Sequence, residues 1–253
     1  NSTGETPTET RTEVRKVQGY RLQVDSEGIV IEAAGEPGLY YGTRTLLQLI
    51  GSDSDNTPEI PGVEIVDWPD IPERAVHYDT KHSQDQMSYV KGFIRDLAHY
   101  KINMLVWEWE DKFAYPSHPE IGAPGAFTME EMQELTRYAQ QYHVQIVPLV
   151  QGLGHVSFIL KWPQFAHLRE IEASNWQFCV LNDGTYDLLF DLWEDAIEAT
   201  PGSKYIHIGS DETYELGHGV DCGCQAMAEE VGLSGLFHMF LGRSARHLQE
   251  IGR

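Results

Sequence analysis

Apolar and polar residues alternate in two short stretches near the amino end, on either side of a turn at residues 25–28. An alternation with period two is typical of half-buried strands, so residues 17–33 are predicted to form a β-hairpin. Residues 39–50 change to the spacing of an amphipathic helix, and a polar loop follows at 51–62. Together these elements predict a small α+β module over residues 13–66.

The pattern changes at Asp67, where short apolar runs begin to alternate with helical stretches. The predicted strands are 75–80, 102–107, 144–150 and 204–208. The predicted helices are 85–100, 129–142, 185–199 and 233–251. Thr128 and Glu131 have the spacing of a capping box at the start of the second of these helices. Four strand–helix units with nearly uniform apolar strands indicate a parallel sheet covered by helices, and this pattern fits a doubly wound sheet and a barrel equally well.

Polar side chains follow each predicted strand at its carboxyl end. They are Asp79, Lys81, His82, Glu108, Glu110, Asp111, Gln151, His155, Asp211 and Glu212. Functional groups of parallel α/β folds gather at these ends of the strands. We therefore expect one site rich in carboxylates and histidines.

The segment KYIHIGSDETYELG, residues 204–217, carries the sharpest signal. Strand alternation places Tyr205, His207 and Gly209 on one face, and the adjacent carboxylates Asp211 and Glu212 follow at once. Two close carboxylates raise the proton affinity of one of them, which leaves a neutral acid beside an ionised group, as glycoside cleavage requires. The alternative is an ordinary acidic loop or helix start.

The formal net charge of −21 limits the partners of the chain. Such an acidic surface repels phosphate groups, so we expect no nucleic-acid and no membrane partner, whereas a neutral or cationic substrate is compatible. No apolar run reaches the roughly 18–20 residues of a membrane span. We identify no signal peptide, although a chain that starts at Asn1 is compatible with removal of a leader. The first 12 residues show no apolar pattern and are predicted to be disordered.

Three cysteines are too few for a disulfide scaffold. Cys222 and Cys224, with His218 nearby, could ligate zinc, but their spacing is unusual and structural thiols are favoured. The prediction is therefore no metal ion and no cofactor.

Five segments resemble the motifs of glycoside hydrolase family twenty, the β-N-acetylhexosaminidases, and they occur in that family's order. Residues 204–217 resemble its His-x-Gly-x-Asp-Glu motif. The others are LYYGTRTLLQL (39–49), DWPDIPERAVHYDT (67–80), YKINMLVWEWEDK (100–112) and QIVPLVQGLGHVS (145–157). In its details the chain resembles the hexosaminidase D-like branch of the family.

The resemblance implies a substrate-assisted retaining hydrolase of terminal β-linked N-acetylhexosamine, in which the substrate's acetamido oxygen attacks the anomeric carbon. Glu212 matches the general acid/base, and Asp211 matches the residue that orients the acetamido group. The residues that match substrate contacts are Arg74, Asp111, His155 and His207. Trp107 is a further substrate-binding candidate because its ring could stack on a sugar, with core packing as the alternative.

The chain also departs from the family pattern, because Gln151 replaces an Asp and Glu108 replaces a His, which leaves the sugar preference open. The resemblance implies a (β/α)8 barrel, of which residues 67–253 form only the first half. We therefore expect a truncated chain, a fragment, or a half-barrel that pairs with another copy or with a complementary fragment. Two alternatives remain: a non-catalytic carbohydrate-binding or assembly fragment, and a metal-dependent hydrolase using Glu108, Asp111 and His155.

Overall fold

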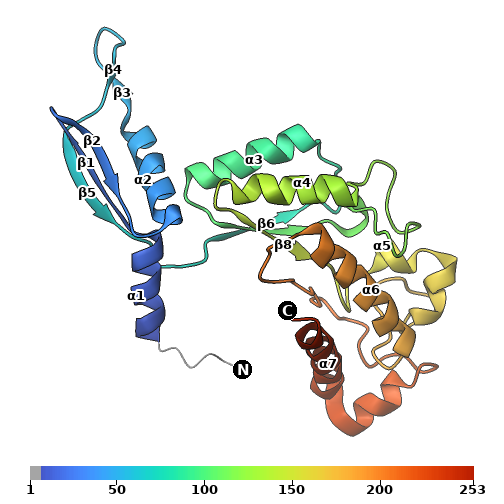
Figure 1. Ribbon diagram of the computed structural model, residues 1–253. Helices are drawn as coiled ribbons and strands as arrows, with labels where there is room; N and C mark the ends of the chain where they lie inside the picture. Colours follow the sequence, from blue (N-terminus) through green and yellow to red (C-terminus); the bar gives the residue numbers. More distant parts are fainter. Residues whose placement is uncertain (1–6) are drawn as a thin grey trace. The chain divides into compact units, whose positions relative to one another are not determined.

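The structure, a computed structural model, describes residues 7–253 and divides into two compact units (Figure 1). The first unit contains the chain up to Ala75 together with residues 92–104 and 139–144. The second unit contains residues 76–91, 105–138 and 145–253.

The first unit is built around a three-stranded antiparallel sheet. Its elements are α1 (Pro7–Gln18), β1 (Tyr20–Asp25), β2 (Gly28–Glu32), α2 (Glu36–Leu49), β3 (Gly51–Ser52), β4 (Pro58–Glu59) and β5 (Val63–Asp67), and the sheet order is β2-β1-β5. The register pairs Leu22 with Ile31 and Asp25 with Gly28, which confirms the predicted hairpin. Tyr20, Leu22, Val24 and Tyr41 form its buried core.

Two predictions for the first unit are wrong in part. The disorder predicted for the first 12 residues does not hold from Pro7 onward, where α1 begins; residues 1–6 lie outside the described part of the chain. The predicted loop at 51–62 contains the short hairpin β3–β4. The Asp53 carboxylate accepts hydrogen bonds from the backbone of Asp55 and Thr57, at 2.9 and 2.8 Å, and so closes the turn between these strands.

The second sheet contains β6 (Ala75–Asp79), β7 (Met104–Glu108) and β8 (Gln145–Leu149), in that order. The helix α3 (Met87–His99) connects the first two strands and α4 (Met129–Gln140) connects the last two. A helical crossover is the connection that parallel neighbours require. The amide of Thr128 donates to the Glu131 carboxylate at 2.9 Å, and the amide of Glu131 donates to the Thr128 hydroxyl at 3.3 Å, which confirms the predicted capping box.

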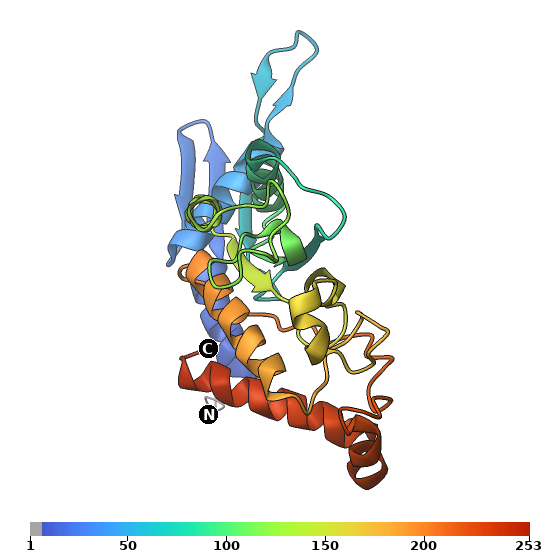
Figure 2. The ribbon, with the colours of Figure 1, turned by 90° about the vertical axis from the view of Figure 1, so that its right-hand side faces the viewer.

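The remaining elements of the second unit are helical. They are η1 (Glu110–Lys112), α5 (Ser157–Leu160), η2 (Pro163–Leu168), α6 (Asp183–Ala199) and α7 (Cys224–Glu250). The helices α6 and α7 lie side by side, with the rings of Phe190 and His247 stacked at 3.7 Å (Figures 1 and 2). Gly232, at φ 76°, interrupts the helical geometry of α7, so the predicted helix 233–251 corresponds to the part after this kink.

The strand predicted at 204–208 is wrong. Only His207 pairs with β8, through its amide to Pro148 O at 2.9 Å and its carbonyl to Val150 N at 3.0 Å. The Gln145 side chain accepts the amide of Lys204 at 2.9 Å, so a side chain takes the place of a backbone partner. Because Gly209 then turns to φ 57°, the ladder cannot continue beyond His207.

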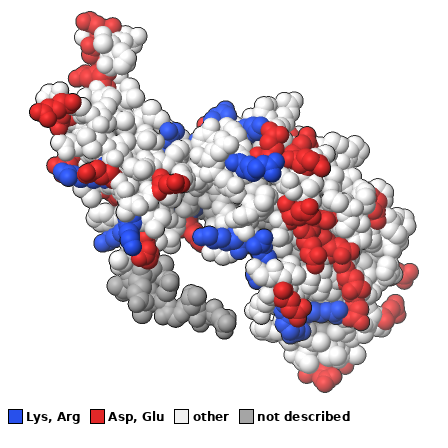
Figure 3. Space-filling model, in the orientation of Figure 1, with Lys and Arg blue, Asp and Glu red and all other residues white. Residues whose placement is uncertain are grey.

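On the second unit, acidic side chains gather in a band on the face drawn in Figure 3. Between residues 7 and 253, no helix combines the length and the apolar character that a membrane crossing demands.

Candidate active site

The carboxyl ends of β6 and β7 are held together by Thr80. Its amide and its hydroxyl both donate to Glu108 O, each at 3.0 Å. Its hydroxyl also accepts the indole N–H of Trp107 at 3.1 Å. This bonding sets the positions of the polar side chains that follow both strands.

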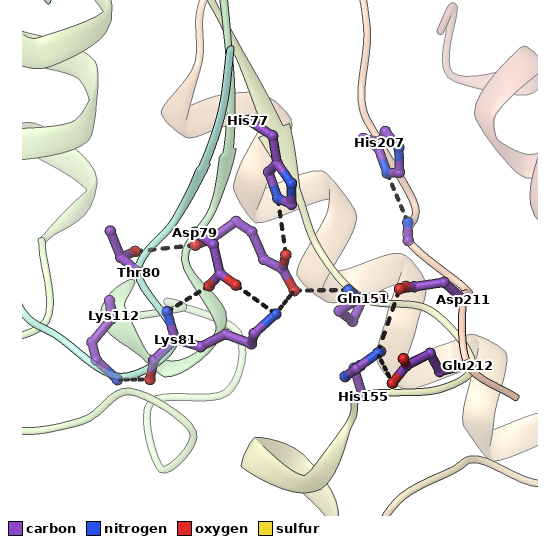
Figure 4. Close-up of polar contacts among 12 residues, drawn as sticks. His77, Asp79, Thr80, Lys81, Lys112, Gln151, His155, His207, Asp211 and Glu212 are labelled. Atoms are coloured by element: carbon purple, nitrogen blue, oxygen red, sulfur yellow. Dashed lines mark hydrogen bonds and ion pairs between the residues drawn. The ribbon is translucent and has the colours of Figure 1, made fainter. Parts of the chain in front are cut away.

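Glu108 is the centre of a polar network (Figure 4). Its side chain is only 2% exposed. One carboxylate oxygen lies 3.0 Å from His77 Nε2, and the other lies 3.2 Å from Lys81 Nζ and accepts Gln151 Nε2 at 2.7 Å. These partners offset the cost of burying the charge. Burial tends to lower the pKa of Lys81, but its hydrogen bond to Asp79 and the charge of Glu108 raise that pKa above its usual value.

Two neighbouring carboxyl groups, Glu110 and Asp111, have opposite titration behaviour. Burial and the nearby Glu108 raise the pKa of Glu110 to about 8. Burial also acts to raise the pKa of Asp111, but hydrogen bonds from Lys112 and Lys161, the latter at 3.0 Å, lower it below its usual value. At neutral pH Asp111 is therefore ionised, whereas Glu110 keeps its proton.

The predicted catalytic pair converges on one histidine. His155 Nε2 lies 3.4 Å from Asp211 Oδ2 and 3.1 Å from Glu212 Oε2 (Figure 4). The carboxylates have 65% and 47% of their side-chain surface exposed, whereas His155 has 16%. The structure thus brings three predicted site residues together, with both acids open to solvent.

The backbone is strained in the two loops that carry these residues, 151–155 and 209–212. His155, Ser210 and Glu212 have φ values of 57°, 79° and 49°. These values lie in the left-handed region, which residues other than Gly rarely adopt. Such residues cost on the order of 1–3 kcal/mol each and concentrate at functional sites. A Cβ on Gly154 would lie 2.3 Å from Asp211 O, so only glycine permits the two loops to approach this closely.

Trp176 was not predicted as a site residue, but it borders the pair. Its ring lies 4.5 Å from that of His155, its indole N–H donates to Glu212 O at 2.9 Å, and it stacks with Tyr214 at 6.4 Å between centroids. A hydrogen bond to Glu212 raises the pKa of Tyr214. No spacing in the sequence connects Trp176 to the acids, because its position depends on how the loops fold.

Three further predicted substrate contacts have hydrogen-bond or packing partners of their own. Arg74 belongs to the first unit, where its guanidinium donates to Lys101 O at 2.7 Å and Gln18 Oε1 at 2.9 Å; its role in sugar binding stays a prediction. His207 accepts the Gly209 amide at Nδ1, at 3.0 Å, and burial together with the charge of His77 lowers its pKa. Trp107 is completely buried, so the sugar-stacking assignment is corrected: its ring has no open face and packs in the core.

The metal-dependent alternative based on Glu108, Asp111 and His155 does not fit this geometry. Both carboxylates are engaged by ammonium groups. Among the side chains that the structure describes, only the three cysteines bring at least three His, Cys, Asp or Glu ligand atoms close enough to share an ion. The contact of His155 with the carboxylates of Asp211 and Glu212 favours acid–base chemistry instead.

Comparisons with known proteins identify the family of the chain. Residues 72–253 match the glycosyl hydrolase family 20 catalytic domain, and residues 5–68 match domain 2 of the same family. The β-hexosaminidase of Porphyromonas gingivalis is 26% identical over 94% of this chain and 35% of its own length. Hexosaminidase D of Homo sapiens is 33% identical over 58% of this chain and 30% of its own length.

Solved structures of the same family share the fold. The chitobiase of Flavobacterium johnsoniae has a TM-score of 0.82 at 26% identity, covering 93% of this chain and 38% of its own. An exo-β-N-acetylglucosaminidase from Vibrio harveyi, in complex with N-acetylglucosamine, has a TM-score of 0.80 at 28% identity, covering 93% and 43%. The chain thus spans about a third of the curated relatives and has an α/β fold similar to these barrel enzymes. The family model covers most of the chain, which belongs to glycosyl hydrolase family 20.

Proposed function

We propose that this chain is the part of a β-N-acetylhexosaminidase that carries the catalytic carboxylates and removes terminal β-linked N-acetylhexosamine. The observation that carries the proposal is the convergence of Asp211 and Glu212 on His155, within a chain of this family. We assign residues 67–253 to the catalytic half-barrel and residues 13–66 to the accessory module. Family matches at 72–253 and 5–68 support these boundaries.

Glu212 is the proposed general acid/base. Its carboxyl group donates a proton to the leaving oxygen while the substrate's acetamido oxygen attacks the anomeric carbon. A cyclic oxazolinium intermediate forms, and a water molecule that gives its proton to Glu212 then opens it. His155 and Trp176 hold Glu212 by its carboxylate and its carbonyl, which limits the orientations of the acid.

Asp211 is the proposed partner of the acetamido group. Its carboxylate accepts the acetamido N–H and stabilises the positive charge that develops during ring closure. Because the Asp211 side chain is largely exposed, it is free to meet a substrate. Asp111, kept ionised by two lysines, is a proposed acceptor for sugar hydroxyl groups.

We also propose that the sugar pocket is completed by protein beyond these residues, supplied by a second copy or a complementary half-barrel fragment. The exposure of Asp211, Glu212 and Tyr214 supports this, because glycosidic bond cleavage benefits from a site that excludes water.

The direct test is hydrolysis of a chromogenic N-acetyl-β-hexosaminide by the full chain. We expect Glu212→Gln to lower kcat by about 10²–10⁴-fold, the usual contribution of a general acid/base, and Asp211→Asn to lower it as well. Asp221→Asn, which removes an exposed carboxylate elsewhere, is the matched control and should keep wild-type activity. Equal turnover by Glu212→Gln and the unaltered chain would overturn the assignment.

A further inference from the structure

All three cysteines of the chain converge outside the carboxylate site. Cys179 precedes α6, Cys222 lies in the loop before α7, and Cys224 is the first residue of α7. Their three Sγ atoms lie within 4.8 Å of one another, and the Cys179 and Cys224 sulfurs are 3.5 Å apart. Cys179 and Cys224 are buried, whereas Cys222 is partly exposed. Segments more than 40 residues apart thus bring every thiol of the protein to one point.

The sulfur positions fit a shared metal ion better than a disulfide. A disulfide holds its two sulfurs at about 2.05 Å and would leave the third thiol unused. Tetrahedral Zn²⁺ with Zn–S bonds of about 2.3 Å spaces its thiolates about 3.8 Å apart. The observed separations reach this geometry with small side-chain adjustments.

The loop that carries Cys222 is held by hydrogen bonds to Glu170 and borders a cavity on one side. The buried Glu170 carboxylate accepts the amides of His218 and Gly219, at 3.1 and 3.4 Å, and Gln177 Nε2 at 2.8 Å. Cys222 borders an open cavity of about 630 Å³ that Glu170 and His218 also line. An ion can therefore reach the sulfurs from solvent, and hydrogen bonds around the ligands hold them in place.

We propose that Cys179, Cys222 and Cys224 bind one Zn²⁺ ion, with a water molecule from the adjoining cavity as the fourth ligand. The ion would fasten the start of α7 to the segment before α6. It would thereby hold the carboxyl end of residues 211–223, the segment that begins with Asp211 and Glu212. This goes beyond the hydrolase activity, and zinc binding can be measured without any substrate.

The test begins with the full chain, reduced and freed of metal with a chelator. Titration with Zn²⁺ should give one bound ion per chain, protect all three thiols from a colorimetric thiol reagent, and raise Tm. Substitution of Co²⁺ should produce the thiolate charge-transfer bands and visible bands of a tetrahedral site. Cadmium NMR on the unaltered chain should report three sulfur ligands, independently of any variant.

The decisive variant is Cys222→Ser, chosen because this partly exposed residue is easier to replace than the two buried cysteines. We expect it to weaken Zn²⁺ binding by more than about 100-fold. Replacing residues that only support the metal ligands already lowers metal affinity by about 10–100-fold. Glu229→Gln, which changes an exposed carboxylate on α7 that does not line this cavity, is the control and should bind as the unaltered chain does. The proposal is overturned by no bound zinc, by unchanged affinity in Cys222→Ser, or by a Cys179–Cys224 disulfide whose reduction leaves a chain that binds no metal.

Discussion

At the scale of single residues, two side chains that differ from the family pattern are in contact with each other. Gln151 Nε2 donates to Glu108 Oε1 at 2.7 Å, and Gln151 Oε1 accepts the Ser210 amide at 3.1 Å. An Asp or Glu at position 151 would place a second carboxylate against Glu108, so the amide is the group that this neighbour requires. Gln151 thereby connects the end of β7 to the residue that precedes Asp211.

This pairing predicts that Gln151→Glu destabilises the chain and that exchange of the two residues repairs it. The single variant should lose about 2–3 kcal/mol, because two buried carboxylates then face each other. The double variant Gln151→Glu with Glu108→Gln restores one acid and one amide, and we expect it to recover at least about 1 kcal/mol beyond the sum of the single changes. Denaturant unfolding of the four proteins measures this coupling; strictly additive losses would show that the contact is unimportant.

Glu110 predicts a pH dependence of stability. Its pKa in the folded chain is raised to about 8 by burial and by Glu108, so folding favours its protonated form. Its contribution to stability is therefore fully present below the pKa of the unfolded chain and is lost as pH rises through about 8. We expect Glu110→Gln to flatten the decrease in Tm between acidic pH and pH 8, whereas Asp221→Asn should leave that decrease unchanged. An identical pH profile in Glu110→Gln would contradict this origin.

At the scale of elements, periodicity predicted the helices α2, α3, α4 and α6 and the hairpin β1–β2, because each depends on local spacing of apolar side chains. It failed at residues 204–208, where pairing depends on whether a distant segment offers backbone partners. It also could not find Trp176, the interplay of Glu108 with Gln151, or Cys179 as the neighbour of Cys224. These arise from tertiary contacts between segments that are far apart in the sequence.

The approach of the loop at 151–155 to the loop at 209–212 predicts that Gly154→Ala impairs catalysis. The new Cβ would lie 2.3 Å from Asp211 O, so the loop that holds the acids must move. We expect a loss of about 1–3 kcal/mol in stability and a larger fall in kcat than in substrate affinity, since misplaced catalytic groups cost rate. Gly92→Ala, in α3 with its nearest neighbour at 3.7 Å, is the control and should be neutral or stabilising. Wild-type kinetics for Gly154→Ala would show that the loop contact does not position the acids.

At the scale of the molecule, the proposed completion of the pocket has to overcome the charge of the chain. Two copies with a net charge of −21 each repel one another, and salt screens that repulsion, with a Debye length of about 10 Å at 0.1 M and 3 Å at 1 M. If a second copy covers Asp211 and Glu212, turnover per chain should rise with protein concentration, and the rise should begin at lower concentration in high salt. Light scattering measured on the same samples should show the mass doubling over the same range. If turnover per chain is constant while the mass stays that of one chain, a single copy is sufficient for activity. If there is no turnover at any concentration until a complementary half-barrel fragment is added, that fragment completes the pocket, because only it then shields the two acids from water.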